Sequence, residues 1–250
     1  MNESLTILVP VYNEENCIRP LTALMDEFLM EPGLDTTVLF VNDGSSDNSA
    51  SLIEDVCRSD QRYSYLMLGK NYGLSTALKA GIDNCHSTFI GYIDADLQTH
   101  PSDFRKLLPF AQHYDLVTGY RLERKDTVTK RLSSVLANSF KRWLLGSDII
   151  DTGCPLKIIR TRVAQQMPFF NGMHRFMPDL VLLLGGVVKQ VPIRHYPRFS
   201  GKSKYGLKNR SLGPLADAIA FRWMQKKFIR YTVRSASLAY GNEIMATGNK

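Results

Sequence analysis

Residues 89–98, FIGYIDADLQ, carry the pattern that decides the fold we expect for this chain. The first five residues are continuously apolar, which is typical of a strand buried on both faces of a parallel sheet. Asp94 and Asp96 follow this run at once. Two carboxylates two residues apart, just past a buried strand, are poor core residues and good ligands for a hard cation. We therefore expect the ligand site at the end of this strand.

The same arrangement, an apolar run followed by a polar turn, occurs three more times earlier in the chain. The three further runs are residues 5–11, 38–41 and 65–68. Between the four runs lie segments with apolar residues at helical spacing, namely residues 15–30, 49–57 and 74–82. Continuously apolar strands that alternate with helices predict an α/β fold with a doubly wound, mostly parallel sheet and flanking helices.

Polar side chains stand at the end of each predicted strand. They are Asn13 with Glu14, Asp43, Asn71, and Asp94 with Asp96. Because ligands of open α/β sheets bind outside the carboxyl ends of the strands, we expect these side chains to converge on one rim. Ordinary turn chemistry is the alternative for Asn13 and Asp43, since Asn and Asp favour turns. For the two later aspartates the alternative is capping of a helix that begins near Pro101.

The second half of the chain is less regular. We expect strands at residues 116–118 and 187–193, a long basic helix at residues 129–145, a glycine- and lysine-rich loop at residues 198–206, a helix at residues 211–234 and a loose tail at residues 235–250. No repeat or low-complexity linker interrupts the sequence, so we expect one domain.

Composition narrows the function further. The chain has 250 residues, a hydrophobic fraction of 44% and a formal net charge of +7, with the basic surplus in its second half. Such a surplus suits nucleic acid, anionic lipid or phosphate-bearing ligands. The four cysteines show no zinc spacing and suggest a reducing cytosol. We find no signal-peptide pattern, and the longest apolar run, residues 180–188, is too short to span a membrane.

Four ordered motifs resemble those of the family 2 glycosyltransferases with the GT-A fold. They are VPVYNEE at residues 9–15, VNDGSSD at 41–47, KNYGL at 70–74 and YIDADLQ at 92–98. The branch that they resemble most contains dolichol-phosphate mannose synthase and the bacterial polyprenyl-phosphate glycosyltransferases. The resemblance implies a Rossmann-like GT-A catalytic domain at residues 1–210, with a nucleotide-sugar half at 1–115 and an acceptor half at 116–210. Residues 211–250 would form an amphipathic membrane-interface helix and tail.

The resemblance also implies a role for each motif residue on the donor side. Pro10, Tyr12 and Glu14 would line the pocket for base and ribose, and Asp43 would accept hydrogen bonds from the base. Asn71 and Ala95 would complete the donor site. Asp94 would lie near ribose and metal, and Asp96 and Gln98 would ligate the metal. The metal would be Mg²⁺ or Mn²⁺, whose shell is typically completed by substrate phosphates.

Basic residues of the second half match the acceptor side of that branch. Arg121 and Arg131 would bind an acceptor phosphate, with Lys130 in reserve; the alternative is a solvated basic helix face. The loop RFSGKSK at residues 198–204 resembles the branch's R-x-x-G-x-S-K loop, in which Arg198 and Lys204 would offset charge on the diphosphate. His195, just before this loop, is expected to be structural.

The second half lacks a convincing general base, apart from Asp151 in the looser DTGCPLK stretch at residues 151–157. A phosphate monoester acceptor needs none, because its second pKa of about 6 leaves it largely ionised near neutral pH. This favours a lipid phosphate acceptor. The alternative is a hydroxyl of a growing polysaccharide, with Asp151 as the base.

A helical projection of residues 221–234 puts aromatic and apolar side chains opposite basic ones. Phe221, Met224, Phe228 and Tyr231 fall on one face, and Lys226, Lys227, Arg230 and Arg234 fall on the other. This arrangement is typical of a helix in a membrane interface. The alternative is a helix packed on the protein's own core.

Together these features predict an inverting, metal-dependent transfer of a sugar from a UDP- or GDP-sugar to polyprenyl (undecaprenyl or dolichyl) phosphate. The enzyme would act peripherally at the cytoplasmic face of the membrane and feed cell-envelope glycan, lipid A or protein glycosylation. Nucleic acid is not an expected partner, because the ordered motifs would have no purpose there. The sequence does not decide between a monomer and a homo-oligomer.

Overall fold

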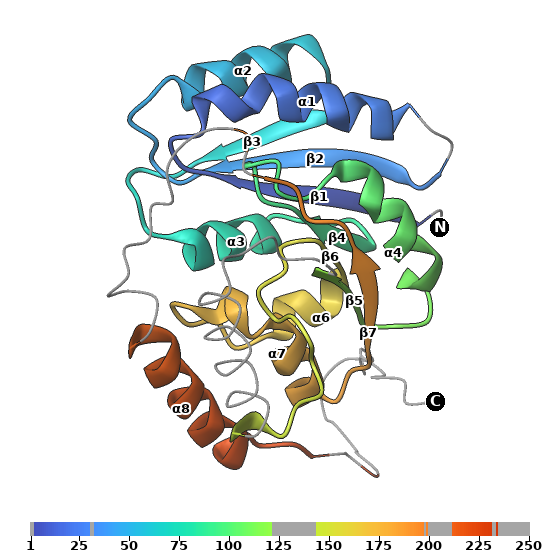
Figure 1. Cartoon of the computed structure of the whole chain (residues 1–250), viewed down its shortest axis with the longest axis vertical. Helices are drawn as coiled ribbons and strands as arrows, with labels where there is room; N and C mark the ends of the chain where they lie inside the picture. Colours follow the sequence, from blue (N-terminus) through green and yellow to red (C-terminus); the bar gives the residue numbers. More distant parts are fainter. Residues whose placement is uncertain are drawn as a thin grey trace, which may run out of the picture.

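Seven strands form one sheet in the order β3-β2-β1-β4-β6-β5-β7 (Figure 1). The computed structural model describes residues 3–30, 33–121, 144–197, 199, 212–231 and 234. The strands are β1 (Ser4–Val11), β2 (Asp35–Asn42), β3 (Tyr63–Met67), β4 (Phe89–Tyr92), β5 (Leu116–Arg121), β6 (Lys157–Arg160) and β7 (Val188–Ile193). Only β6 runs against its neighbours β4 and β5, and every other pairing is parallel. The predicted doubly wound, mostly parallel sheet is therefore confirmed.

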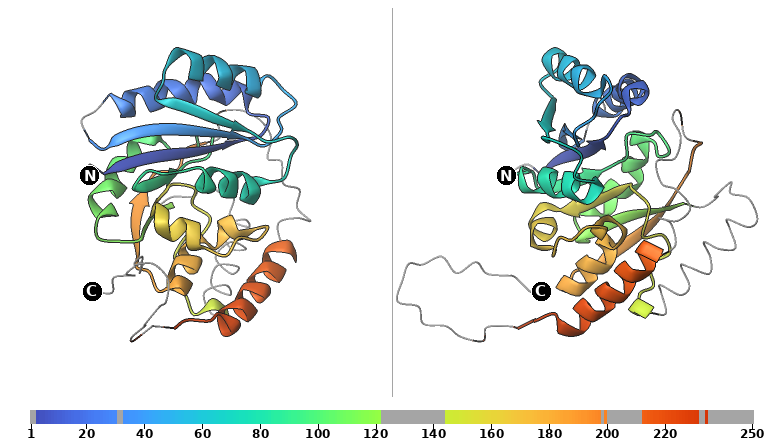
Figure 2. Two further views of the ribbon diagram at one scale, coloured as in Figure 1. Left: turned by 180° about the vertical axis from the view of Figure 1, so that it is seen from behind. Right: turned by 90° about the vertical axis from the view of Figure 1, so that its left-hand side faces the viewer.

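Helices cover both faces of this sheet (Figure 2). One face carries α1 (Glu15–Leu29), α2 (Ser49–Ser59) and α4 (Phe104–Ala111), which follows the short helix η1 (Pro101–Asp103). The other face carries α3 (Leu74–Asp83), α6 (Thr161–Gln166), η2 (Met173–Arg175) and α7 (Met177–Leu184), and α8 (Leu212–Lys227) packs outside this layer. Alternate residues of each strand feed the two cores, as the pleat requires: Ile7 packs under the α1 face and Leu8 under the α3 face.

Two expectations about buried elements need correction. The strand expected at residues 65–68 was taken to be buried on both faces, but β3 is the edge of the sheet and Tyr65 is 42% exposed. An edge strand has a neighbouring strand on one side only, so its side chains are less covered than those of a central strand. The apolar composition of β3 therefore overstated its burial. Strand β6 was not predicted, and α4 was anticipated only as part of a helix beginning near Pro101. Both are short, and β6 begins with a lysine that interrupts the apolar pattern.

The C-terminal helix also differs from the prediction. Helix α8 ends at Lys227, so residues 228–231 do not continue the face projected for residues 221–234. Phe221, expected in the membrane face, is 1% exposed and stacks on Phe176 with ring centroids 5.0 Å apart. An ion pair of 3.0 Å between Arg175 and Asp217 further holds α8 to η2. This side of the helix packs on the protein's own core, as the alternative reading held.

None of the helices in the described part of the chain has the length and apolarity needed to span a membrane. Helix α7, which contains most of the longest apolar run, is only eight residues long. The basic helix expected at residues 129–145 lies almost wholly outside the described residues.

Candidate functional site

The loops after β1 and β2 are joined by hydrogen bonds into one rim. The backbone of Asn13 has a φ of 52°, and its side-chain Oδ1 accepts from Ser46 N at 2.7 Å. In return, Asn13 N donates to Ser45 Oγ at 2.9 Å, and Glu14 N donates to Ser49 Oγ at 2.9 Å. The motifs around residues 9–15 and 41–47 are therefore one structural unit, as their expected convergence requires.

The third loop is fixed to the second by Asp43 and Gly44. The Asp43 carboxylate is 3% exposed, and its two oxygens accept from Tyr72 N at 2.8 Å and Gly73 N at 2.7 Å. Gly44 has a φ of +65°, and a Cβ there would lie 2.3 Å from the carbonyl carbon of Lys70, so only glycine permits this approach. Asp43 thus clamps the loop after β3. Its contact with a base stays a prediction.

The remaining donor-side residues lie along this rim. Pro10 is in the last part of β1, Tyr12 and Glu14 are in the loop that follows, and Asn71 is in the loop after β3. Ala95 is buried between the two aspartates. The register aligns the strand ends, with Val11 opposite Asn42 and Asn42 opposite Met67.

The aspartate motif forms a tight turn at the end of β4. The Tyr92 hydroxyl donates to Asp94 Oδ1 at 2.7 Å, and Gln98 N donates to Asp96 Oδ1 at 3.0 Å. Between them, Leu97 has a φ of 60°, which is uncommon for a leucine and marks backbone strain held by the surroundings. The helix η1 is capped instead by His100, whose Nδ1 accepts from Ser102 N, so the reading of the aspartates as helix caps is wrong.

Two carboxylates in a sheltered place repel each other. Burial, and after it the charge of Asp96, raise the pKa of the Asp94 carboxyl to about 6. The Tyr92 hydroxyl and the cation of Lys157 act in the opposite direction. A divalent cation would offset this repulsion, and Mg²⁺ or Mn²⁺ typically uses one or two protein carboxylates together with substrate phosphates. Within the described ranges no cluster of three or more His, Cys, Asp or Glu could hold a metal. The donor set fits a metal shared with a ligand.

The segment after β7 runs beside the aspartate turn. Tyr196 N donates to Gln98 O at 3.0 Å, and Phe199 N donates to Asp96 O at 3.4 Å. The side chain of His195 lies near that of Gln98, with 3.5 Å between Nε2 and Nε2. The glycine-rich loop expected to close over the diphosphate therefore begins next to the expected metal ligands. Arg198 and Lys204 themselves are outside the described residues.

The two residues expected on the acceptor side, Arg121 and Asp151, form a bidentate ion pair. Arg121 Nε lies 2.6 Å from Asp151 Oδ2, and Nη2 lies 2.9 Å from Oδ1. Both side chains are nearly buried, at 12% and 13% exposure. The two residues predicted separately, one for the acceptor phosphate and one as a base, are thus each other's partner. Arg131 and Lys130 lie outside the described residues.

Sequence reasoning missed Lys157. This side chain is 1% exposed, its Nζ donates to the backbone oxygen of Cys154, and it lies 5.6 Å from the ring centroid of Tyr92. Burial lowers the pKa of the lysine ammonium, while nearby negative groups, including Asp94, act against this shift. The signal that could have found it is the lysine inside the otherwise apolar stretch LKII at residues 156–159.

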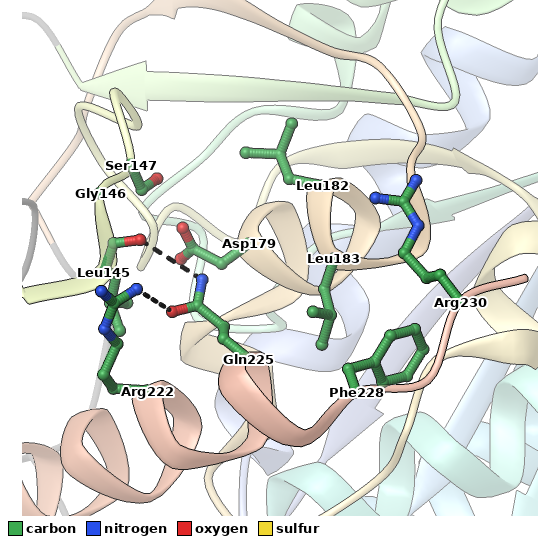
Figure 3. Close-up of a pocket in the computed structure, with 10 residues that line it drawn as sticks. All are labelled: Leu145, Gly146, Ser147, Asp179, Leu182, Leu183, Arg222, Gln225, Phe228 and Arg230. Atoms are coloured by element: carbon green, nitrogen blue, oxygen red, sulfur yellow. Dashed lines mark hydrogen bonds between the residues drawn. The ribbon is translucent and has the colours of Figure 1, made fainter.

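A pocket of about 310 Å³ lies between α7, α8 and residues 145–147 (Figure 3). Gln225 of α8 connects this helix to residue 145, because its Nε2 donates to Leu145 O at 3.3 Å. Its Oε1 accepts from Arg222 at 3.4 Å. Its lining includes none of the predicted site residues, so this pocket is separate from the rim.

Comparison with known proteins identifies the family of the chain that carries this rim. The model of "Glycosyl transferase family 2" matches residues 6–169, which include all the strand-end motifs and both partners of the Arg121–Asp151 pair. This chain belongs to glycosyl transferase family 2. The family predicted from the four motifs is therefore confirmed.

Several curated members of the family are similar over most of the chain. An undecaprenyl-phosphate 4-deoxy-4-formamido-L-arabinose transferase of Edwardsiella ictaluri is 31% identical over 204 residues, covering 81% of this chain and 63% of that protein. A dodecaprenyl-phosphate galacturonate synthase of Rhizobium johnstonii is 29% identical over 238 residues, covering 92% and 68%. The chain thus spans about two thirds of the length of these relatives.

Solved structures share the fold. Mannosyl-3-phosphoglycerate synthase from Rubrobacter xylanophilus superposes with a TM-score of 0.69 at 18% identity, covering 94% of this chain and 78% of that one. Glucosyl-3-phosphoglycerate synthase from Mycobacterium tuberculosis, solved with Mn²⁺ and UDP-glucose, gives a TM-score of 0.65 at 15% identity, covering 92% and 81%. At these identities the likeness establishes the fold alone.

Proposed function

We propose that this protein transfers one sugar, with inversion, from a nucleotide-sugar to a polyprenyl phosphate. The observation that carries the proposal is the rim itself: the loops after β1, β2 and β3 are hydrogen-bonded to one another, and the Asp94–Asp96 turn follows β4, the strand next to β1, in a family 2 glycosyltransferase. The named activities of the Edwardsiella and Rhizobium relatives support the acceptor class. Strands of both halves belong to one sheet, which supports a single catalytic unit, proposed as residues 1–210.

On the donor side, Asp94, Asp96 and Gln98 would hold Mg²⁺ or Mn²⁺, which supplies positive charge to the departing diphosphate. The loops after β1, β2 and β3 present the nucleotide site with Pro10 and Tyr12 at its wall. Their hydrogen bonds fix this surface before a ligand binds, so little ordering is left to oppose binding.

The Arg121–Asp151 pair supports a phosphate over a hydroxyl as the acceptor. A carboxylate whose two oxygens both accept from one guanidinium is poorly placed to remove a proton. Arginine has five N–H donors, and this pair uses Nε and Nη2, so Nη1 can still bind a phosphate oxygen. An ionised phosphate needs no base, because its oxygen already carries the charge with which it attacks the anomeric carbon.

Helix α8 supports contact with a membrane surface through a face other than the one projected from sequence. Ile219 and Trp223, one turn apart, are 55% and 65% exposed, and Arg222, Lys226 and Lys227 are exposed close by. No acidic residue occurs between residues 218 and 234. Exposed tryptophan among cations suits an anionic lipid interface. This supports the proposed peripheral contact with a membrane, whose cytoplasmic face remains the expectation from the sequence.

The deciding experiment is transfer of radiolabelled sugar into an organic-soluble lipid. Purified protein is incubated with undecaprenyl phosphate, Mn²⁺ and each of several UDP- and GDP-sugars. We expect label in the lipid phase, its loss in EDTA, and its loss in Asp96→Asn with an unchanged unfolding transition. Transfer that continues undiminished in EDTA would overturn the metal role. Labelling of a polysaccharide acceptor but not of the lipid would overturn the acceptor.

The competing function, transfer to a glycan hydroxyl, makes a separate demand. Under it Asp151 is the base, and Asp151→Asn abolishes turnover while nucleotide binding is retained. Under our proposal the same variant disturbs Arg121, so it raises the KM for the lipid phosphate more than it lowers kcat.

A further inference from the structure

Lys157 is a lysine placed inside the core directly below the aspartate turn. It is the first residue of β6, where it pairs across the sheet with Tyr92, the last residue of β4. Its side chain is 1% exposed. Burial of an ammonium group is costly unless the group is paired, so a core lysine at this position requires a compensating interaction.

The contacts of Lys157 lead to the expected metal site in two steps. Its Nζ donates to the backbone oxygen of Cys154 and lies 5.6 Å from the centroid of the Tyr92 ring. The hydroxyl of that ring donates to Asp94 Oδ1 at 2.7 Å. A cation beside a phenol ring is attracted to it and polarises it, and hydrogen-bonded groups in such a chain reinforce one another.

This arrangement answers a need of the aspartate turn. Asp94 and Asp96 stand two residues apart in this turn, and Asp96 is only 7% exposed. The hydroxyl of Tyr92 fixes the orientation of one Asp94 oxygen. The ammonium group of Lys157 beside the ring adds positive charge near this pair without occupying the place of a metal ion.

We propose that Lys157, acting through Tyr92, is a positioning residue that holds the Asp94 carboxylate ready for the divalent cation. The proposal rests on the function proposed above, since it concerns the same metal site. Lys157 would touch neither the metal nor the substrate. Groups that orient metal ligands in this way typically change metal affinity or activity by about 10- to 100-fold when they are removed.

The test measures Mn²⁺ binding directly, by electron paramagnetic resonance titration of the full chain, with and without UDP. Lys157→Met keeps most of the apolar side chain and removes the ammonium group with its hydrogen bond to Cys154, and Tyr92→Phe removes only the hydroxyl. We expect each to weaken Mn²⁺ binding by about 10-fold or more. The double variant should bind Mn²⁺ with nearly the same affinity as the more affected of the two single variants, because both changes interrupt one chain of contacts.

Lys189→Met is the matched control. Lys189 also lies on the sheet, in β7, with Nζ 5.2 Å from the ring centroid of Phe110 and 5.9 Å from that of Tyr114. It has the same kind of cation–ring contact on residues outside the rim. Its loss should leave the Kd for Mn²⁺ unchanged.

A purely structural role for Lys157 predicts a different pattern. If the role is purely structural, Lys157→Met has a lower unfolding temperature than the wild type but the same Kd for Mn²⁺. This result would overturn the proposal. If Lys157→Met does not fold, Tyr92→Phe decides alone, since wild-type affinity in that variant breaks the chain of contacts. Failure of the wild-type protein to bind Mn²⁺ would instead reject the metal-dependent function together with this inference.

Turnover adds a second readout. Under the proposal, Lys157→Met raises the Mn²⁺ concentration needed for half-maximal activity, and saturating Mn²⁺ restores most of kcat. A kcat that stays low at saturating Mn²⁺, with half-maximal activation at the wild-type concentration, would contradict a role in positioning the metal ligand.

Discussion

The substitution Asp43→Asn tests whether this carboxylate is a structural clamp. Asp43 is 3% exposed and accepts one backbone N–H on each oxygen, at 2.8 Å from Tyr72 and 2.7 Å from Gly73. Asparagine keeps one acceptor and turns an NH₂ group toward the other N–H, so one buried donor loses its partner. A hydrogen bond to a charged group contributes about 1.5–3 kcal/mol, and stranding a buried donor costs about 1–3 kcal/mol.

We therefore expect Asp43→Asn to lower the free energy of unfolding by about 3 kcal/mol, from the loss of one charged bond and the weakening of the other. For a chain of this size that corresponds to a fall in Tm of about 6–12 °C. The measurement is urea unfolding followed by far-UV circular dichroism, together with calorimetric titration with UDP and Mn²⁺. Nucleotide affinity should fall as well, because the loop after β3 loses its fixed position.

Asp47→Asn is the matched control for this prediction. Asp47 also accepts two backbone N–H groups, from Ser49 at 3.0 Å and Glu15 at 3.1 Å, but it is only partly buried, so water can replace a lost partner. Asp47→Asn should lower the free energy of unfolding by about 1 kcal/mol or less. If Asp43→Asn unfolds within about 0.5 kcal/mol of wild type while nucleotide affinity collapses, Asp43 reads the base and the clamp reasoning is wrong.

Two further predictions concern helix α8 and the buried thiols. Phe221→Ala should destabilise the protein by about 3–5 kcal/mol in urea unfolding, because it removes the ring stacked on Phe176; Trp223→Ala should leave stability within about 0.5 kcal/mol and reduce sedimentation with anionic vesicles. Equal loss of stability in both variants would refute the assigned faces. Burial raises the pKa of the Cys85 and Cys154 thiols to about 11, so at pH 8 few thiolates form and both should react with a thiol reagent only after unfolding; rapid labelling of the native protein would contradict their burial.

The first half of the fold could be predicted because its signals are local. Each of the strands β1, β2 and β4 contains an apolar run that is followed by a polar turn, and the helices between them have apolar residues at helical spacing. The rim follows from the rule that strand ends of a parallel sheet meet at one edge. Local patterns of this kind do not depend on which segment packs against which.

The parts that could not be predicted depend on tertiary pairing. The burial of Lys157 is set by its cross-strand partner Tyr92, which lies 65 positions earlier in the chain and is joined to it only through the fold. The Arg121–Asp151 pair is of the same kind, since each residue alone suggested a separate function. For α8, the helical projection was right about amphipathicity but could not show that the Phe221 face meets Phe176.

The reversed direction of β6 has a consequence for how such an enzyme can change its specificity. Every parallel strand reaches the rim with its last residue, but β6 starts there, at Lys157 opposite Tyr92. Residues 151–156, proposed for the acceptor side, therefore precede a strand, whereas the loops proposed for the donor side follow strands. Insertions or deletions in this segment could reshape the acceptor side while every ladder of the sheet kept its register. The topology thus separates the segment proposed for the acceptor from the loops proposed for the nucleotide.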